Sequence, residues 1–172
     1  MEHLRSLGWT EESIFIFSVP LVFALIALEA LIGSLKNRKY YDWGDTLGTL
    51  GMLGGNVLIA GWTQSLAFGA MVFVYQFRIF DFSHLLPTWL FLIVTLFAID
   101  LVFYIWHRAS HRMRFLWAIH LSHHSSEQMN FVVAFRQPWL APLFKIPFFS
   151  VLPLLGFEPT VIVVVGAVST FW

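Results

Sequence analysis

The sequence predicts an all-α integral membrane protein folded as one helical bundle. Of the 172 residues, 58% are hydrophobic and only 12% are Asp, Glu, Lys or Arg, about half the charged share of an ordinary soluble domain. The mean hydropathy is +0.74. Because an open sheet edge cannot face lipid, long apolar runs are expected to be helices. We therefore expect about three to four spanning helices and a re-entrant hairpin, in a single domain over residues 1–172.

The composition excludes several classes of protein. Ten basic and ten acidic residues give a formal net charge of zero, so there is no bulk positive field to attract nucleic acid. Cysteine is absent, which excludes disulfide scaffolds, thiolate-ligated haem, iron–sulfur clusters and cysteine-type zinc sites. The first apolar run is longer than the core of a signal peptide and no A-x-A cleavage site follows it, so it predicts a retained anchor.

The first two apolar regions are expected to cross the membrane. The first covers about Ile14–Leu35 and is interrupted only by Glu29. Glu29 either reaches the interface from near a helix end or lines a lipid or substrate path, because a membrane carboxylate normally faces protein or water. The second covers Thr46–Phe77 without a charge. As a helix it measures about 48 Å against a bilayer core of about 30 Å, so it must tilt, protrude or break, and Gly61–Gln64 is the expected weak point.

The C-terminal half is expected to add one span and a hairpin. The third span covers about Leu86–Trp106 and ends in a basic, histidine-rich stretch. The next apolar region, Trp139–Phe157, contains three prolines, which predict a kinked or re-entrant hairpin. The last run, Thr160–Trp172, is rich in β-branched residues but too short to span. Its apolar character nevertheless favours a helix over a strand.

Two basic clusters set the expected orientation, since Lys and Arg mark the cytoplasmic side. One follows the first span and the other follows the third. They share a side only if the region between them crosses once, which favours a single long second helix. The clusters are Lys36, Arg38, Lys39 and Arg108, Arg112, Arg114.

Histidine is concentrated in one short stretch. Five of the seven histidines lie within 18 residues: His107, His111, His120, His123 and His124. On a helix, the side chains of His107 and His111 project from the same face. They can therefore chelate one metal or give one ligand to each of two metals. His120 and His123 repeat this one-face spacing, and His124 points about 100° away from His123, so the adjacent pair can serve two metals. Neutral imidazole suits Fe, Zn, Cu or Ni.

Polar residues beside the histidines are candidates for orienting them. Asp100 lies seven residues before His107 and on nearly the same helix face, where it can accept a hydrogen bond from a ligand's second ring N–H. Glu127 and Asn130 either orient ligand imidazoles or cap the next helix. The two remaining histidines, His3 and His84, fall outside the pattern and are expected to be interfacial residues.

The stretch Asp100–Gln137 resembles the fatty acid hydroxylase / sterol desaturase superfamily of integral-membrane di-iron oxygenases. The resemblance rests on the HxxxH box that begins at His107 and the HxxHH box that begins at His120. The contexts Trp-His-Arg at 106–108 and His-Ser-Ser-Glu-Gln-Met-Asn at 124–130 are also similar. The bacterial sterol-desaturase-like branch is the most similar.

The resemblance implies a bundle that supports a cytosolic histidine-rich cap. In this family two non-haem irons use O₂ as co-substrate to hydroxylate or desaturate a fatty acid, sterol or ether lipid, or to cleave an ether lipid. Electrons come from an external donor of the cytochrome b5 or ferredoxin type. The matching residues imply iron ligation by His107, His111, His120, His123 and His124. A bacterial inner membrane is the expected location, with the histidines on the cytoplasmic side.

The sequence departs from the family pattern at its C-terminal end. No histidine follows His124, whereas the family has a further cluster that completes the pair of metals. Residues 159–172 carry no charged side chain, so a terminal carboxylate there would lie in an apolar segment. We therefore expect a C-terminally incomplete, N-terminal fragment. The alternatives are a truncated or degenerate non-catalytic membrane protein of the same fold, a membrane haem protein, and an intramembrane zinc protease, which lacks the H-E-x-x-H signature.

Overall fold

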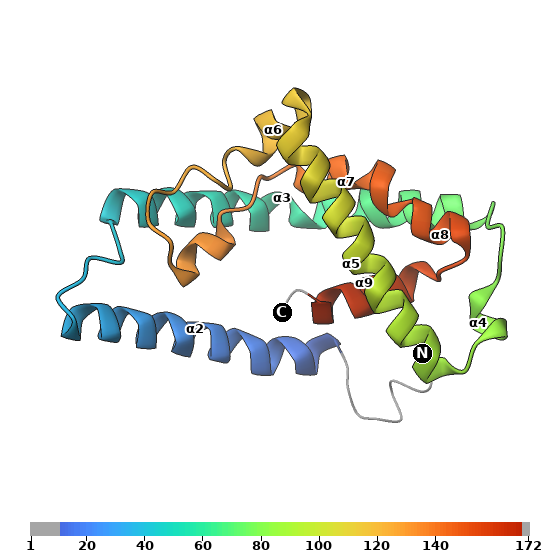
Figure 1. Cartoon of the computed structure of the whole chain (residues 1–172), viewed down its shortest axis with the longest axis horizontal. Coiled ribbons are helices and arrows are strands. Elements are labelled where there is room, and N and C mark those ends of the chain that lie inside the picture. The colour runs from blue at the N-terminus through green and yellow to red at the C-terminus, as the bar shows by residue number, and fades with distance from the viewer. Residues whose placement is uncertain (1–10, 170–172) are drawn as a thin grey trace. The chain divides into compact units, whose positions relative to one another are not determined.

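The structure is a computed structural model that describes residues 11–169, without the side chains of residues 11–19, Ser83 and His84. His3 therefore lies outside the described residues. Within 11–169 every regular element is helical, which confirms the all-α prediction. The elements are α2 (Glu11–Leu35), α3 (Trp43–Tyr75), α4 (Phe82–Leu85), α5 (Thr88–Arg112), α6 (Arg114–His120), the 3₁₀ helix η1 (Phe131–Phe135), α7 (Ala141–Phe149), α8 (Val151–Leu155) and α9 (Pro159–Ser169) (Figure 1).

The chain divides into two compact units. The first comprises the chain up to Leu53 together with Ser125–Arg136, and the second comprises Gly54–His124 and the chain from Gln137 onward. The predicted histidine ligands all belong to the second unit. Glu127 and Asn130 belong to the first.

In the part of the chain that the structure describes, two helices are long and apolar enough to cross a membrane, namely α3 and α5. Large apolar side chains on α3 are exposed, as on a lipid-facing helix, and Leu58 is 86% exposed. Shorter apolar helices cover Pro20–Leu35, Ala141–Leu155 and Pro159–Ser169. A higher number of spans, and the re-entrant insertion of the hairpin, stay predictions.

The helix α3 is continuous over 33 residues. The prediction of a single long helix is confirmed, and the predicted weak point at Gly61–Gln64 is wrong. Within that segment the Thr63 hydroxyl donates to the carbonyl of Ile59 at 3.1 Å. A glycine costs a helix about 1 kcal/mol, whereas each backbone group left unpaired in lipid costs several kcal/mol, so the unbroken helix is favoured.

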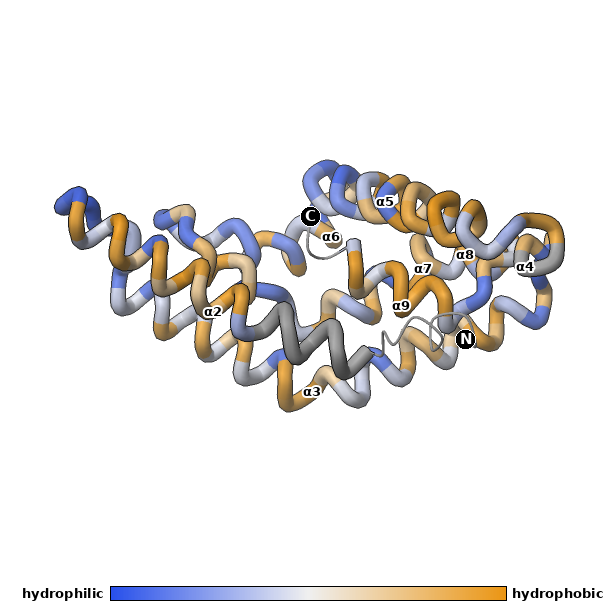
Figure 2. The backbone as a smooth tube through the Cα atoms, turned by 90° about the horizontal axis from the view of Figure 1, so that it is seen from below, coloured by the Kyte–Doolittle hydropathy of each residue, from blue (hydrophilic) through white to orange (hydrophobic). Residues whose placement is uncertain are grey.

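The second unit is built around α5. Its buried residues recur every three to four positions, so one face of the helix is covered. Phe91, Ile99 and Val102 form a buried cluster with Leu152 of α8 and Ile162 of α9. Figure 2 shows α5 hydrophobic over most of its length and hydrophilic at the end that carries the first histidine box.

The helices α7 and α8 together form one bent helix, because Ser150 between them keeps right-handed helical angles. The C-cap of α8 is Gly156, whose φ of 112° is a left-handed conformation. A Cβ at Gly156 would lie 2.1 Å from the carbonyl oxygen of Phe80, so only glycine fits. The chain then enters α9, which is helical as predicted despite its β-branched residues.

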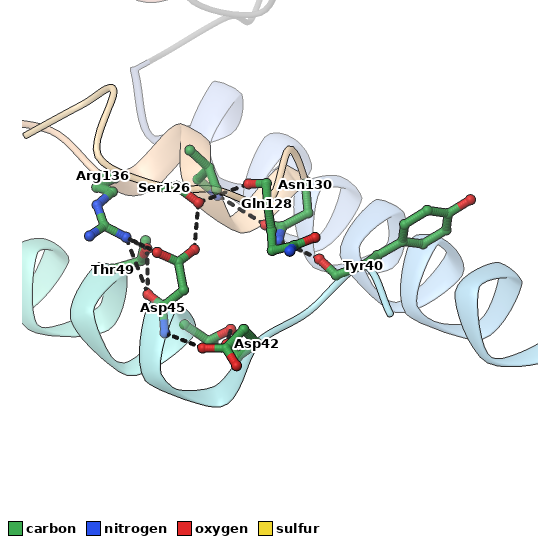
Figure 3. Close-up of polar contacts among 10 residues, drawn as sticks. Tyr40, Asp42, Asp45, Thr49, Ser126, Gln128, Asn130 and Arg136 are labelled. Atoms are coloured by element: carbon green, nitrogen blue, oxygen red, sulfur yellow. Dashed lines mark hydrogen bonds and ion pairs between the residues drawn. The ribbon is translucent and has the colours of Figure 1, made fainter. Parts of the chain in front are cut away.

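The first unit contains a network of paired polar groups around Asp45 (Figure 3). The Asp45 carboxylate accepts hydrogen bonds from the Arg136 guanidinium and the Ser126 hydroxyl. Arg136 also donates to the hydroxyl of Thr49 at 3.3 Å. Asp42 accepts a hydrogen bond from the backbone N–H of Asp45 at 2.9 Å and so caps the start of α3.

Glu29 ties α2 to two other segments of the first unit. Its Oε2 accepts hydrogen bonds from the Tyr41 hydroxyl at 2.6 Å and from the backbone N–H of Phe131 at 2.9 Å. It also lines an open cavity of about 250 Å³ with the apolar residues Leu25, Leu28 and Ile32. The Glu29 carboxylate therefore lies against protein and on the wall of a cavity.

Candidate metal centre

The reversal between α5 and α6 brings the two histidine boxes together. Met113 has φ −102° and ψ 122°, an extended conformation that ends α5, and its N–H donates to the carbonyl of Ala109. The helix α6 begins at the next residue and returns along the end of α5 (Figure 1). Trp106, which is only 6% exposed, packs edge-on against the His120 ring with 5.6 Å between the ring centroids.

Four of the five predicted ligands form one compact group. The Nε2 atoms of His107 and His111 are 3.0 Å apart, and those of His120 and His124 are 3.1 Å apart. The rings of His107 and His120 lie 4.7 Å apart between centroids, as do those of His111 and His124. One ligand atom from each of these four histidines lies within 4.8 Å of the others. We call these residues the four-histidine group.

In the second box, the ring nearest to His120 is that of His124, 4.8 Å away between centroids, and the chain between them continues in a turn after α6. Leu121 is right-handed helical, and the N–H of His124 donates to the Leu121 carbonyl at 3.0 Å. The His123 ring lies beside the group, 5.4 Å from the His120 ring between centroids. Its Nδ1 is 3.4 Å from the side-chain Nε2 of Gln137.

The surroundings of His120 and His124 keep both rings in the neutral form that binds metals. Burial, and then the positive charge of neighbouring rings, lowers the pKa of His120 to about 4. The pKa of His124 is lowered by burial first and then by His123 and His111. Both rings are therefore neutral at pH 7 and offer a nitrogen lone pair.

The four-histidine group fits a single metal ion. Imidazole nitrogens bind first-row metals at about 2.0–2.1 Å, so two ligand atoms on one ion are separated by at most about 4.2 Å. The observed spread of 4.8 Å reaches that limit with small side-chain movements. An all-imidazole set suits Fe, Zn, Cu or Ni. Among the described side chains no second group of this kind occurs, so a second ion needs ligands beyond these four.

The predicted orienting residues lie in three different settings. Asp100 is about 10 Å along the α5 axis from His107 and does not join the four-histidine group. Asn130 caps η1, since its Oδ1 accepts from the N–H of Val133 at 3.3 Å, and its amide donates to the Tyr40 carbonyl at 2.8 Å. Its helix-capping alternative is therefore the one observed. Glu127 is exposed.

Sequence reasoning missed two residues beside the histidines. Lys145 of α7 places its ammonium 4.5 Å from the Trp106 ring centroid and 5.5 Å from that of Phe103, so its charge rests on aromatic faces. A lone charge in the apolar run 139–157 is a signal that could have found it. Gln137, which contacts His123, gave no comparable signal.

A family model described as fatty acid hydroxylase matches residues 92–172. Both histidine boxes lie inside this matched segment. The match therefore covers the four-histidine group, most of α5 and all the elements after it.

Two curated relatives are both alkylglycerol monooxygenases. The protein from Caenorhabditis elegans is 48% identical over 50 residues, which are 29% of this chain and 9% of the relative. The protein from Xenopus tropicalis is 36% identical over 56 residues, which are 33% of this chain and 13% of the relative. The similarity thus spans only about a tenth of each relative. No solved structure matches the chain.

Proposed function

We propose that this protein functions as an O₂-dependent, non-haem di-iron oxygenase that hydroxylates or desaturates a C–H bond of a membrane lipid. The observation that carries the proposal is the convergence of four imidazoles from two boxes inside a fatty acid hydroxylase segment. Similarity to alkylglycerol monooxygenases supports an ether lipid as one substrate class, beside fatty acids and sterols.

The proposal assigns a role to each box histidine. His107, His111, His120 and His124 hold one iron, and His123 serves a second iron together with ligands outside the four-histidine group. When bound, the irons supply the redox chemistry of O₂ that side chains cannot perform. The protein's part is to keep the imidazoles neutral and to cover one side of the centre. Trp106, which contacts His120, contributes to that cover.

The membrane placement follows from the helices. The helices α3 and α5 cross the bilayer, with further spans and the bent helix of α7 and α8 completing one domain. The histidine end of α5 lies at the cytoplasmic surface, in a bacterial inner membrane, where a cytochrome b5 or ferredoxin type of donor delivers electrons. Asp100 and Glu127 are retained as candidates for orienting ligands, although no contact with the four-histidine group supports either.

The test combines metal content with oxygen incorporation. The chain is expressed with supplementary iron, purified in detergent and analysed for bound metals. It is then supplied with reductant, extracted membrane lipids and ¹⁸O₂. For the wild type we expect bound iron and a lipid product that carries either ¹⁸O, from hydroxylation, or a new C=C bond, from desaturation. We expect neither bound iron nor product for a His111→Ala/His124→Ala double variant. A His84→Ala variant serves as the matched control, because His84 lies outside both boxes.

Two results would count against the proposal. A chain that contains no iron after supplementation would refute the metal assignment. A chain that binds iron through the four histidines but yields neither ¹⁸O-labelled lipid nor a new C=C bond would support the alternative, a non-catalytic membrane protein of the same fold. A haem absorption band would instead point to axial ligation by paired histidines.

A further inference from the structure

We infer that the first unit holds a binding site at Glu29 for a single-chain lipid with a neutral hydroxyl headgroup. The Glu29 carboxylate accepts the hydrogen of that hydroxyl, and the lipid chain lies against apolar side chains of α2. The site belongs to the first unit, whereas the four-histidine group belongs to the second. The inference therefore goes beyond the proposed function and does not depend on a bound metal.

The cavity beside Glu29 has the walls of a lipid site. Its volume is about 250 Å³, and its lining residues are Leu25, Leu28, Glu29, Ile32, Tyr40 and Phe131. The four residues from α2 recur every three to four positions, so they follow one another along one face of the helix. Pockets that bind apolar molecules share this character, with mostly apolar walls and a few placed polar groups.

The walls of the cavity are held in place by contacts within the first unit. The Tyr40 ring packs on Gly33 of α2, where an added Cβ would lie 2.6 Å from a ring atom. The side-chain amide of Asn130 donates to the Tyr40 carbonyl at 2.8 Å (Figure 3). The loop after α2 and the segment before η1 are therefore fixed against each other, and the cavity is formed before a lipid enters.

The Glu29 carboxylate has one oxygen left for a ligand. The Tyr41 hydroxyl and the backbone N–H of Phe131 both donate to Oε2. Burial, and then the hydrogen bond to Glu29, raises the pKa of Tyr41, which therefore keeps its hydrogen as the donor. Among the residues that the structure describes, none donates to Oε1. A carboxylate oxygen accepts further hydrogen bonds, so Oε1 offers an acceptor to a ligand with a donor group.

Charge in the first unit favours a neutral donor over a cationic one. The loop 36–42 carries three cations and one carboxylate, a net charge of +2, from Lys36, Arg38, Lys39 and Asp42. This positive field disfavours an ammonium headgroup near the cavity. A fatty acid would instead bring a second negative charge to Glu29, which repels it. A hydroxyl donates to the carboxylate without adding charge, and it is the headgroup that fits both constraints.

The experiment measures photolabelling of the metal-free full chain in phosphatidylcholine vesicles. The probe is dodecanol with a photoreactive diazirine in its chain, and the matched ligands are its methyl ether and the corresponding amine. We expect saturable labelling by the alcohol, which mass spectrometry of the labelled peptides should map to α2. The methyl ether should label about tenfold more weakly, because it cannot donate a hydrogen bond to the charged Glu29.

Two variants test the carboxylate and the apolar wall separately. Glu29→Gln keeps an acceptor for Tyr41 and Phe131, but its amide N–H donates to the alcohol and the ether alike. The preference for the alcohol should therefore disappear. Leu28→Trp fills the cavity and should abolish saturable labelling. Leu31→Trp is the matched control, because Leu31 is 55% exposed against 51% for Leu28 and does not line the cavity.

Three results would overturn the inference. Equal labelling of the wild type by the alcohol and the ether would show that Glu29 does not recognise the headgroup. Stronger labelling by the amine would assign the site to a cationic lipid. Labelling that does not saturate would show that α2 only contacts the bilayer. Because neither metal nor O₂ is present, each result leaves the iron and lipid-product test of the proposed function undecided.

Discussion

The Asp45 network of the first unit and the four-histidine group of the second unit are both polar clusters, but they differ in how their charges are balanced. Around Asp45, a carboxylate meets a guanidinium and two hydroxyl-bearing residues lie within hydrogen-bond range. The four-histidine group contains only imidazoles, with Nε2 atoms 3.0 Å and 3.1 Å apart in its two pairs. The first cluster pairs opposite charges within the chain and stabilises the fold. The second presents only nitrogen donors, which is the donor set that a first-row metal ion binds.

The largest expected effect comes from breaking the four-histidine group. His111→Ala removes one of four ligands and should weaken the binding of the first metal ion by more than about 100-fold. Removing a residue that only hydrogen-bonds a ligand weakens metal binding by up to about 100-fold, and removing the ligand itself should cost more. Because His111 is exposed, the thermal unfolding of the metal-free chain should change little. Equilibrium dialysis against Co²⁺ gives the affinity. Equal affinities for His111→Ala and His84→Ala would contradict the assignment.

Breaking the Asp45 network should affect stability and leave metal binding unchanged. Asp45→Ala leaves the Arg136 guanidinium, whose side chain is 13% exposed, without its carboxylate. We expect the free energy of unfolding to fall by about 3 kcal/mol, as measured by denaturant unfolding in detergent. The matched control is Asp81→Ala. The side chains of Arg78 and Asp81 are 38% and 34% exposed, so their ion pair should contribute less than about 1 kcal/mol.

A smaller effect is expected from two glycines of α3. Gly55→Ala drives a Cβ into the Trp139 ring, and the resulting overpacking should lower stability by about 1–3 kcal/mol. Gly61→Ala meets no atom within 4 Å and should raise stability by up to about 1 kcal/mol through helix propensity. The two melting temperatures should therefore move in opposite directions. A shift of the same sign would show that the Trp139 contact does not restrain this part of the chain.

A further expected effect is a dependence of stability on pH. Burial lowers the pKa of His120 from the ordinary 6.5 to about 4. Between these values the unfolded chain binds more protons than the folded chain, so stability should rise with pH over this window. Melting curves of the metal-free protein at pH 4.5, 5.5 and 6.5 (about two decades of acidity) test this. His120→Asn should flatten the trend, and an unchanged slope in that variant would assign the effect to other groups.

The sequence predicted the parts of this structure that depend on local spacing. The i,i+4 pair of His107 and His111 faces one side of α5, as a helical period requires. The single α3 helix also followed from its uninterrupted apolar run. The sequence also placed His120 and His123 on one helix face. In the structure the Nε2 of His124 lies 3.1 Å from that of His120, an i,i+4 spacing that the right-handed helical angles of Leu121 continue.

The long-range contacts could not be predicted from the sequence. Arg136 meets Asp45 across 91 residues, and Asn56 meets Gln137 across 81 residues. Each contact is a single polar pair, and no periodic pattern in the sequence predicts it. Glu29 shows the same limit, since its position in an apolar run indicated a partner but did not identify Tyr41 or Phe131.

The one-residue break at Met113 has a consequence for how the metal centre forms. Because α5 reverses directly into α6, all members of the four-histidine group come from a single stretch of chain with short sequence separation. Sites of such low contact order need little loop closure and assemble rapidly. The first metal position therefore draws all its ligands from the 18 residues His107–His124.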